Sequence, residues 1–101
     1  MIERVVLVKL RPEYRGAEDL AKIADQTRQV LATIPEVKAL RVGLPATPRT
    51  EGAYQILIEV RLDDLEAVER YRAHPAHRAY VDVFLRPMME GIRAYDFDVG
   101  A

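Results

Sequence analysis

The sequence contains no cysteine, serine, asparagine or tryptophan, and it holds two histidines. The absence of cysteine excludes disulfides, thiolate zinc sites and thiol nucleophiles. The absence of serine excludes the serine-hydrolase mechanisms, and four threonines are the aliphatic hydroxyls that remain. Because histidine is the side chain that ordinarily titrates near neutral pH, proton chemistry in this chain has few candidate carriers.

An excess of charge of one sign and long hydrophobic runs are also lacking. Fifteen lysines and arginines oppose sixteen aspartates and glutamates, which gives a formal net charge of −1. This balance predicts no nucleic-acid partner and no attraction to an anionic membrane surface. The apolar run at residues 5–10 is too short for a signal peptide, and no stretch approaches a membrane span. We therefore expect a cytoplasmic protein.

The pattern of apolar residues predicts one domain, residues 1–101, with alternating strands and helices. Period-two alternation predicts strands at residues 2–10, 37–44, 54–62 and 92–99. Three-and-four spacing predicts a helix at residues 17–33, which Pro35 ends. Asp63 fits the N-cap of a helix that runs to about residue 73, with Glu66 in the capping-box position. A helical stretch follows at residues 76–84, and residues 45–52 read as a loop.

This order of elements is the α+β, ferredoxin-like βαββαβ pattern, in which helices cover one face of an antiparallel sheet. The sheet is apolar on both faces, since Val5 and Leu7 alternate with Val6 and Val8 on the first strand. An exposed apolar face of this kind usually marks a contact between proteins. We therefore expect a homodimer in which two sheets pack together as a dimeric α+β barrel.

Four segments, residues 1–10, 34–38, 71–77 and 95–97, resemble the stress-responsive A/B barrel (Dabb) family. The most specific of them is Tyr-Arg-Ala-His-Pro-Ala-His at residues 71–77. The resemblance covers essentially the whole chain and implies a dimeric α+β barrel. It also implies a pocket between sheet and helices, where a few members bind or cyclise polyketide-like molecules without a cofactor.

The resemblance assigns catalytic roles to two residues, His77 as a base and Tyr71 in substrate placement. A neutral imidazole suits the removal of a C–H proton next to a carbonyl. Where the family keeps a further histidine on the first strand, this sequence has Arg4, which cannot act as a base but could hold a carboxylate or an enolate oxygen. The alternatives are a packing role for His77, a core position for Tyr71 and a solvent-exposed Arg4.

Further candidates for ligand binding follow from alternation and from the resemblance. They are Val6, Val8, Ile58, Val60, Met89 and Ile92, and each of them also fits an ordinary core position. His74 is a further candidate, although its place before Pro75 also fits a helix cap.

A metal site is not predicted. His74 and His77 are three residues apart and share a helical face, but no third ligand is evident. The resemblance leaves open a cation held by backbone carbonyls near Leu31, Ile34 and Val37.

Two functions remain from the sequence. The first is a homodimeric barrel that binds an apolar or weakly acidic small molecule, either as a binding protein alone or with a cofactor-free proton transfer of the cyclase or isomerase type. The second is a non-catalytic stress-response or interaction protein whose dimer is the functional unit.

Overall fold

The computed structural model describes residues 1–100, in which four strands form a single antiparallel sheet. The strands are β1 (Ile2–Leu10), β2 (Ala39–Gly43), β3 (Ile56–Leu62) and β4 (Met89–Asp98). Their order across the sheet is β2-β3-β1-β4, so β1 and β3 are central. This arrangement confirms the α+β, ferredoxin-like fold expected from the sequence.

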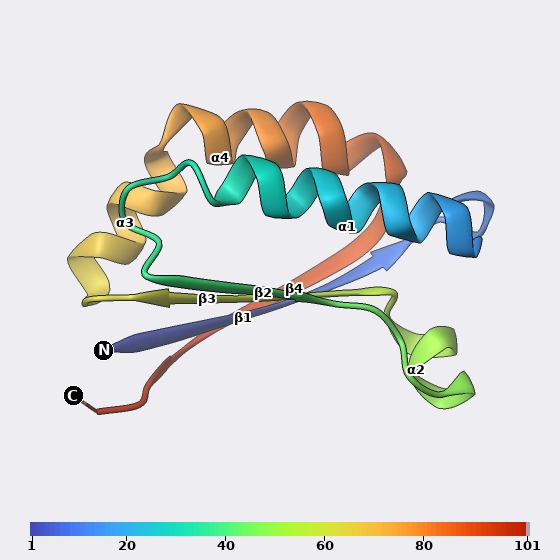
Figure 1. The fold of residues 1–101 in the computed structure, drawn as a ribbon, viewed down its shortest axis with the longest axis horizontal. Coiled ribbons are helices and arrows are strands. Elements are labelled where there is room, and N and C mark those ends of the chain that lie inside the picture. The colour runs from blue at the N-terminus through green and yellow to red at the C-terminus, as the bar shows by residue number, and fades with distance from the viewer. Residues whose placement is uncertain (101) are drawn as a thin grey trace.

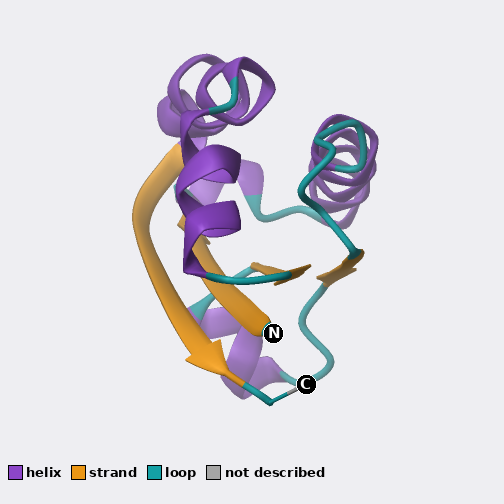
Figure 2. Cartoon of the chain, turned by 90° about the vertical axis from the view of Figure 1, so that its left-hand side faces the viewer, coloured by secondary structure: helices purple, strands orange, loops and turns teal. Residues whose placement is uncertain are grey.

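The helices that cover the sheet lie together on one of its faces (Figure 1). They are α1 (Ala17–Leu31), α3 (Leu65–Ala73) and α4 (Pro75–Ala79), and α4 continues into a π-helical segment, η2 (Tyr80–Leu85). Figure 2 shows that this helical layer has two neighbouring parts above the strands, one formed by α1 and the other containing α4. The short helix α2 (Pro48–Ala53) lies at the end of the sheet away from the two termini (Figure 1). Two 3-10 turns, η1 (Pro12–Tyr14) and η3 (Arg86–Met88), complete the connections.

The hydrophobic core lies between the helices and the face of the sheet that they cover. Strict alternation buries Ile56, Ile58, Val60 and Leu62 of β3 on this face. From β1 it receives Ile2, Val6, Val8 and Leu10, and from α1 it receives Leu20, Ile23 and Leu31. Each fully buried aliphatic side chain of this kind stabilises the fold by roughly 1.5–3 kcal/mol.

The other face of the sheet carries apolar side chains without a cover in the protomer. Val5 pairs across strands with Tyr95, and Glu3 pairs with Phe97. Tyr95 is 49% exposed and Phe97 is 56% exposed, whereas Val6 and Val8 of β1, which lie on the helical face, are buried. The uncovered face is therefore a sheet surface with a large apolar part, as the alternation in the sequence predicts.

Several boundaries differ from the sequence-based expectation for local reasons. The first helix ends at Leu31 rather than Thr33, because tighter hydrogen bonds to Val30 and Leu31 replace helical ones before Pro35. The expected loop at 45–52 contains α2, which Thr47 caps through its hydroxyl and Pro48 begins. The last strand begins at Met89, three residues early, and its pairing with β1 skips Glu90, because Lys9 pairs with Gly91 and Leu10 pairs with Met89.

The prediction of Asp63 as an N-cap is wrong by one residue. The cap of α3 is Asp64, whose carboxylate accepts from the backbone N–H of Ala67 at 2.8 Å. With Asp64 as the cap, the third helical position is Ala67, so Glu66 cannot close a capping box. None of the helices within residues 1–100 is both long enough and apolar enough to cross a membrane.

Candidate functional site

A cavity of about 220 Å³ lies between the sheet and the helical layer and collects most of the candidate residues. Its walls come from β1, β3 and β4 on one side and from α1, α3, α4 and η2 on the other. The lining residues are Arg4, Val6, Leu31, Ile58, Tyr71, Arg72, His77, Tyr80, Val81, Leu85, Ile92 and Ala94. A larger hollow, of about 590 Å³, is lined by Asp63, Asp64 and Glu66 near the start of α3 and contains no imidazole or phenol.

The structure brings together most, but not all, of the residues proposed from the sequence. Arg4, Val6, Ile58, Tyr71, His77 and Ile92 all line the cavity. Val8 and Val60 lie on the expected face, but both are fully buried in the core and do not line the cavity. Met89 packs against the core at the start of β4, where the early start of that strand places it away from the lining.

His74 also lies outside the lining, because it is the cap between α3 and α4. Its Nδ1 accepts from the backbone N–H of Ala76 at 3.1 Å, which is the N-cap contact of α4. Pro75 then occupies the first helical position. The capping role considered for His74 is the one that this geometry supports.

His77 of α4 is held by the backbone carbonyl of Arg72. The distance from Nδ1 to that oxygen is 3.2 Å. Since a carbonyl oxygen can only accept, Nδ1 must carry the proton, and in the neutral ring Nε2 then has the free lone pair. Burial lowers the pKa of His77, the carbonyl of Arg72 raises it, and the positive charges of Arg4 and Arg72 lower it further. The net direction is downward, so the ring is neutral, and able to accept a proton, at pH 7.

Tyr71 lies beside this imidazole on the buried side of α3. The centroids of the Tyr71 and His77 rings are 4.6 Å apart, with the planes tilted by 52°. Burial raises the pKa of Tyr71, and the positive charge of Arg4 only partly opposes this. The phenol therefore stays protonated at neutral pH and serves as a hydrogen-bond donor. Among the hydrogen bonds of residues 1–100, none uses its hydroxyl, which leaves the donor available to a ligand.

Arg4 of β1 enters the cavity from the sheet and pairs with the acid opposite it. Arg4 and Asp96 are register partners across β1 and β4. One terminal nitrogen, Nη1, donates to both carboxylate oxygens of Asp96, at 2.9 and 2.8 Å. The Nε of Arg4 is buried and has no hydrogen-bond partner within the described part of the chain. A buried donor left in this state destabilises a fold by about 1–3 kcal/mol.

Tyr80 of η2 forms the wall opposite the sheet and is tied to α1. Thr27 donates its hydroxyl proton to the carbonyl of Ile23 at 2.7 Å, and its oxygen lies 2.6 Å from the Tyr80 hydroxyl. Because the Thr27 proton is already used, Tyr80 must donate to Thr27. Burial raises the pKa of Tyr80, so this phenol also stays protonated. Tyr80 can accept a hydrogen bond from a ligand, but its own proton is committed.

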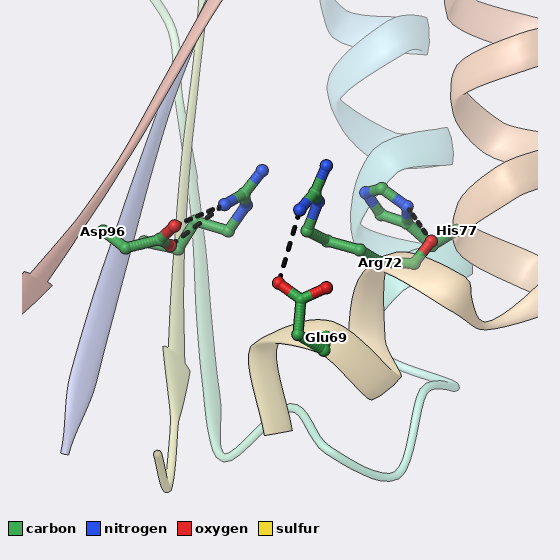
Figure 3. Close-up of polar contacts among 5 residues, drawn as sticks. Glu69, Arg72, His77 and Asp96 are labelled. Carbon is green, nitrogen blue, oxygen red and sulfur yellow. Dashed lines mark hydrogen bonds and ion pairs between the residues drawn. The ribbon is translucent and has the colours of Figure 1, made fainter. Parts of the chain in front are cut away.

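Arg72 is the functional residue that the sequence reasoning missed most clearly. It follows Tyr71 on α3 and lines the same cavity. In Figure 3 its side chain extends away from α3 toward the strands, on the side where Asp96 lies. Its one side-chain partner among residues 1–100 is Glu69, at 3.4 Å. Helical spacing from His77 could have identified Tyr80, but nothing in the local sequence showed that Arg72 turns toward the cavity.

The described residues give no support for a metal centre. Within residues 1–100 no group of three or more His, Cys, Asp or Glu is arranged to hold an ion. In the turn after α1, the carbonyl of Leu31 accepts from Ile34, and that of Ile34 accepts from Val37. Each of these two carbonyls therefore already accepts one hydrogen bond within the turn.

The fold is similar to those of solved structures from bacteria and plants. A Dabb-family protein with a ferredoxin-like fold from Mesorhizobium loti is 21% identical, with a TM-score of 0.81 and coverage of 99% of this chain and 97% of the other. A dimeric ferredoxin-like protein of unknown function from Thermobifida fusca is 22% identical, with a TM-score of 0.80 and coverage of 97% and 90%. A hydroxynitrile lyase from Passiflora edulis is 14% identical, with a TM-score of 0.78 and coverage of 98% and 93%.

No curated protein matches the chain. The family model of the stress responsive A/B barrel domain matches residues 2–99, which is nearly the whole chain. The ferredoxin-like sheet, the helices on one face and the Tyr71–His77 segment at the cavity agree with this match. The chain therefore belongs to the stress-responsive A/B barrel (Dabb) domain family.

Proposed function

We propose that the cavity binds a small apolar or weakly acidic molecule and that His77 removes a proton from it without a cofactor. The observation that carries this proposal is the state of the imidazole. The carbonyl of Arg72 holds the proton on Nδ1, which leaves a lone pair on Nε2 of a ring that lines an apolar cavity. Tyr71, the neighbouring donor, contacts the same ring. An open apolar space shared by these two side chains favours an enzyme over a filled core.

The proposed step is the abstraction of a proton next to a carbonyl group. Nε2 of His77 takes the proton, the electrons of the C–H bond form the enolate double bond, and the carbonyl electrons move to oxygen. Tyr71 donates a hydrogen bond to that oxygen, and the positive charge of Arg4 stabilises it. In a cyclisation the enolate carbon attacks a second carbonyl of the same molecule, and His77 returns its proton to the alkoxide that forms. In an isomerisation His77 returns the proton to another atom of the enolate. Neither outcome needs a redox partner.

We propose that the protomer acts within a homodimer. The apolar part of the uncovered sheet face includes Tyr95 and Phe97, which are exposed in the isolated protomer, and Val5, which is partly exposed. A second copy packed sheet to sheet would cover this surface and leave the cavity, which lies on the helical face, accessible. The dimeric description of a structure with the same fold supports this arrangement.

Proton abstraction can be tested with phenylacetone in D₂O, in which exchange of the methylene protons is followed by NMR. We expect the wild type to accelerate exchange and His77→Ala to lose roughly 10²–10⁴-fold of that acceleration, the range for a general base. Tyr71→Phe should retain binding and lose part of the rate. His74→Asn is the matched control, because it removes the other imidazole and keeps a capping side chain at this position. Equal exchange by the wild type and His77→Ala would contradict the proposed role of His77.

A second candidate function is favoured by the exposed sheet face. If the dimer itself is the functional unit, the protein acts through the surface of the dimer. The role of His77 is then structural, through its hydrogen bond to Arg72 at the junction between α3 and α4. In that case the protein does not accelerate phenylacetone exchange over the rate measured without protein. Variants that disrupt the sheet interface, and not His77→Ala, would then abolish the function of the dimer.

A further inference from the structure

Two arginines reach the cavity from opposite walls. Arg4 comes from β1 in the sheet, and Arg72 comes from α3 in the helical layer. Both guanidinium groups act electrostatically on His77, which lies on the same cavity wall as Arg72. The polar end of the cavity is therefore bordered by two permanent positive charges.

Neither arginine has used all of its hydrogen-bond donors. A guanidinium has five N–H donors, and the side-chain contacts of Arg4 involve only Nη1, with a buried Nε that has no partner in residues 1–100. Arg72 contacts Glu69 at 3.4 Å, and both side chains are more than half exposed. An exposed pair of this kind contributes little, so Arg72 is free to exchange Glu69 for a ligand. Several charge-bearing donors are thus available at one place.

The remaining lining gives the charge balance and shape of the ligand. No Asp or Glu is among the lining residues within the described chain, and Asp96, which lies beside Arg4 on the next strand, already neutralises Arg4. Once Arg72 exchanges its exposed partner Glu69 for a ligand, the site offers about one positive charge, which suits a monoanion better than a phosphate dianion. The rest of the wall is aliphatic, with Val6, Leu31, Ile58 and Ile92.

We propose that the cavity selects a small organic monocarboxylate, with the carboxylate between Arg4 and Arg72 and the apolar body against the aliphatic wall. The planar fork of a guanidinium matches a carboxylate, and the two groups supply donors from two sides. This inference deepens the proposed function by naming the substrate class of the same cavity. It makes Arg72 a binding residue and Arg4 both a binding residue and the partner of Asp96.

The test compares benzoate, its neutral isostere benzamide and phenyl phosphate, each titrated against the full chain by calorimetry, with the His77 ring signals as the NMR marker of the site. We expect benzoate to bind at least tenfold more tightly than benzamide and to shift the His77 signals. Arg72→Met should weaken benzoate binding about tenfold and leave benzamide unchanged. Arg70→Met is the matched control, because Arg70 lies on the same helix, pairs with Glu36 and does not line the cavity.

Arg4→Met leaves the carboxylate of Asp96 without its partner, and the double variant Arg4→Met with Asp96→Asn removes that unpaired charge. If the folded double variant still prefers benzoate as strongly as the wild type does, Arg4 is not part of the site and the proposal falls. Equal affinity for benzoate and benzamide, or tighter binding of phenyl phosphate, also overturns it. These results would overturn the substrate class alone, because they are compatible with a wild type that accelerates phenylacetone exchange. Failure of the proposed function would instead appear as a wild type that does not accelerate that exchange.

Discussion

At the residue scale, one backbone carbonyl decides which nitrogen of His77 can work as a base. The oxygen of Arg72 fixes the proton on Nδ1, and burial together with two neighbouring arginines favours the neutral ring. A partly opposing charge comes from Asp82 on η2. The surroundings therefore disfavour the imidazolium that proton abstraction creates. An anion bound beside Arg4 and Arg72 would relieve this, which links the proposed carboxylate to the proposed chemistry.

The first prediction concerns the pH dependence of stability. Because the pKa of His77 is lower in the folded state than its ordinary value of 6.5, the unfolded state takes up the proton first as the pH falls. The contribution of His77 to stability is full above that value and is lost as the pH falls from 6.5 through the folded pKa. Urea unfolding at pH 7.5 and 5.5 should show a decrease in the free energy of unfolding that is smaller in His77→Gln.

A direct titration of the His77 ring by NMR should give a midpoint below 6.5. In the unfolding experiment, the lower limit of pH 5.5 avoids most of the titration of ordinary carboxyl groups, whose pKa values lie near 4. A midpoint above 6.5, or an identical pH dependence in His77→Gln, would show that burial does not govern this ring.

The second prediction concerns the buried pair of hydroxyls that ties η2 to α1. Thr27→Val leaves Tyr80 without the acceptor for its proton, so we expect the free energy of unfolding to fall by roughly 1–3 kcal/mol. The double variant Thr27→Val with Tyr80→Phe should lose less free energy of unfolding than the sum of the losses in the two single variants. We expect this difference, the coupling energy, to be about 0.5 kcal/mol or more. Urea unfolding of the four proteins measures this, and additive effects would mean that the two hydroxyls do not interact.

At the element scale, the start of α3 offers a comparison between adjacent residues. Asp64 accepts the N–H of Ala67, whereas Asp63 makes an exposed contact of 3.7 Å with Lys38. We therefore predict that Asp64→Ala lowers the free energy of unfolding by roughly 1 kcal/mol, the usual effect of losing an N-cap. Asp63→Ala should change it by less than about 0.5 kcal/mol, as for an exposed pair. Equal losses in thermal unfolding would contradict the assignment of the cap.

The elements that could be predicted are those whose periodicity depends on burial. Alternation in β3 and the three-and-four pattern of α1 identify the buried faces, because one side of each element contacts the core. The short helix α2 was missed because prolines and a glycine outweighed the Thr47 cap and Pro48 at the first position. The π-helical geometry of η2 was missed because it depends on packing against α1 and not on a local motif.

The candidate site could be predicted where one element alone determines it. Placing Arg4 on the same side of β1 as Val6 needed only the alternation of the strand, and in the structure both side chains line the cavity. The pairing of Arg4 with Asp96 depends on strand register across 92 residues of chain, which no local pattern contains. The turn of Arg72 toward the cavity likewise depends on how α3 sits on the sheet.

At the scale of the whole molecule, the two faces of one sheet have separate roles. The helical face holds the cavity, whereas the uncovered face presents Tyr95 and Phe97 beside ion pairs such as Arg61 with Glu3. A mixture of apolar side chains and paired charges suits an interface that packs against a copy of itself, because a twofold axis brings the same patch to both sides. The dimer and the cavity should therefore be separable by substitution.

The last prediction tests that separation. Phe97→Glu places a charge on each side of the proposed interface, so two unpaired carboxylates would be desolvated on association. We expect the wild type to have twice the monomer mass in multi-angle light scattering and Phe97→Glu to have the monomer mass at micromolar concentration. Val83→Glu is the matched control, because Val83 is 74% exposed on the helical side of the molecule and its substitution should leave the dimer intact.

Benzoate affinity should be nearly unchanged in a folded Phe97→Glu monomer, since residues of one protomer line the cavity. A monomeric wild type would contradict the homodimer, and a folded Phe97→Glu monomer that loses benzoate would show that the site needs the second copy.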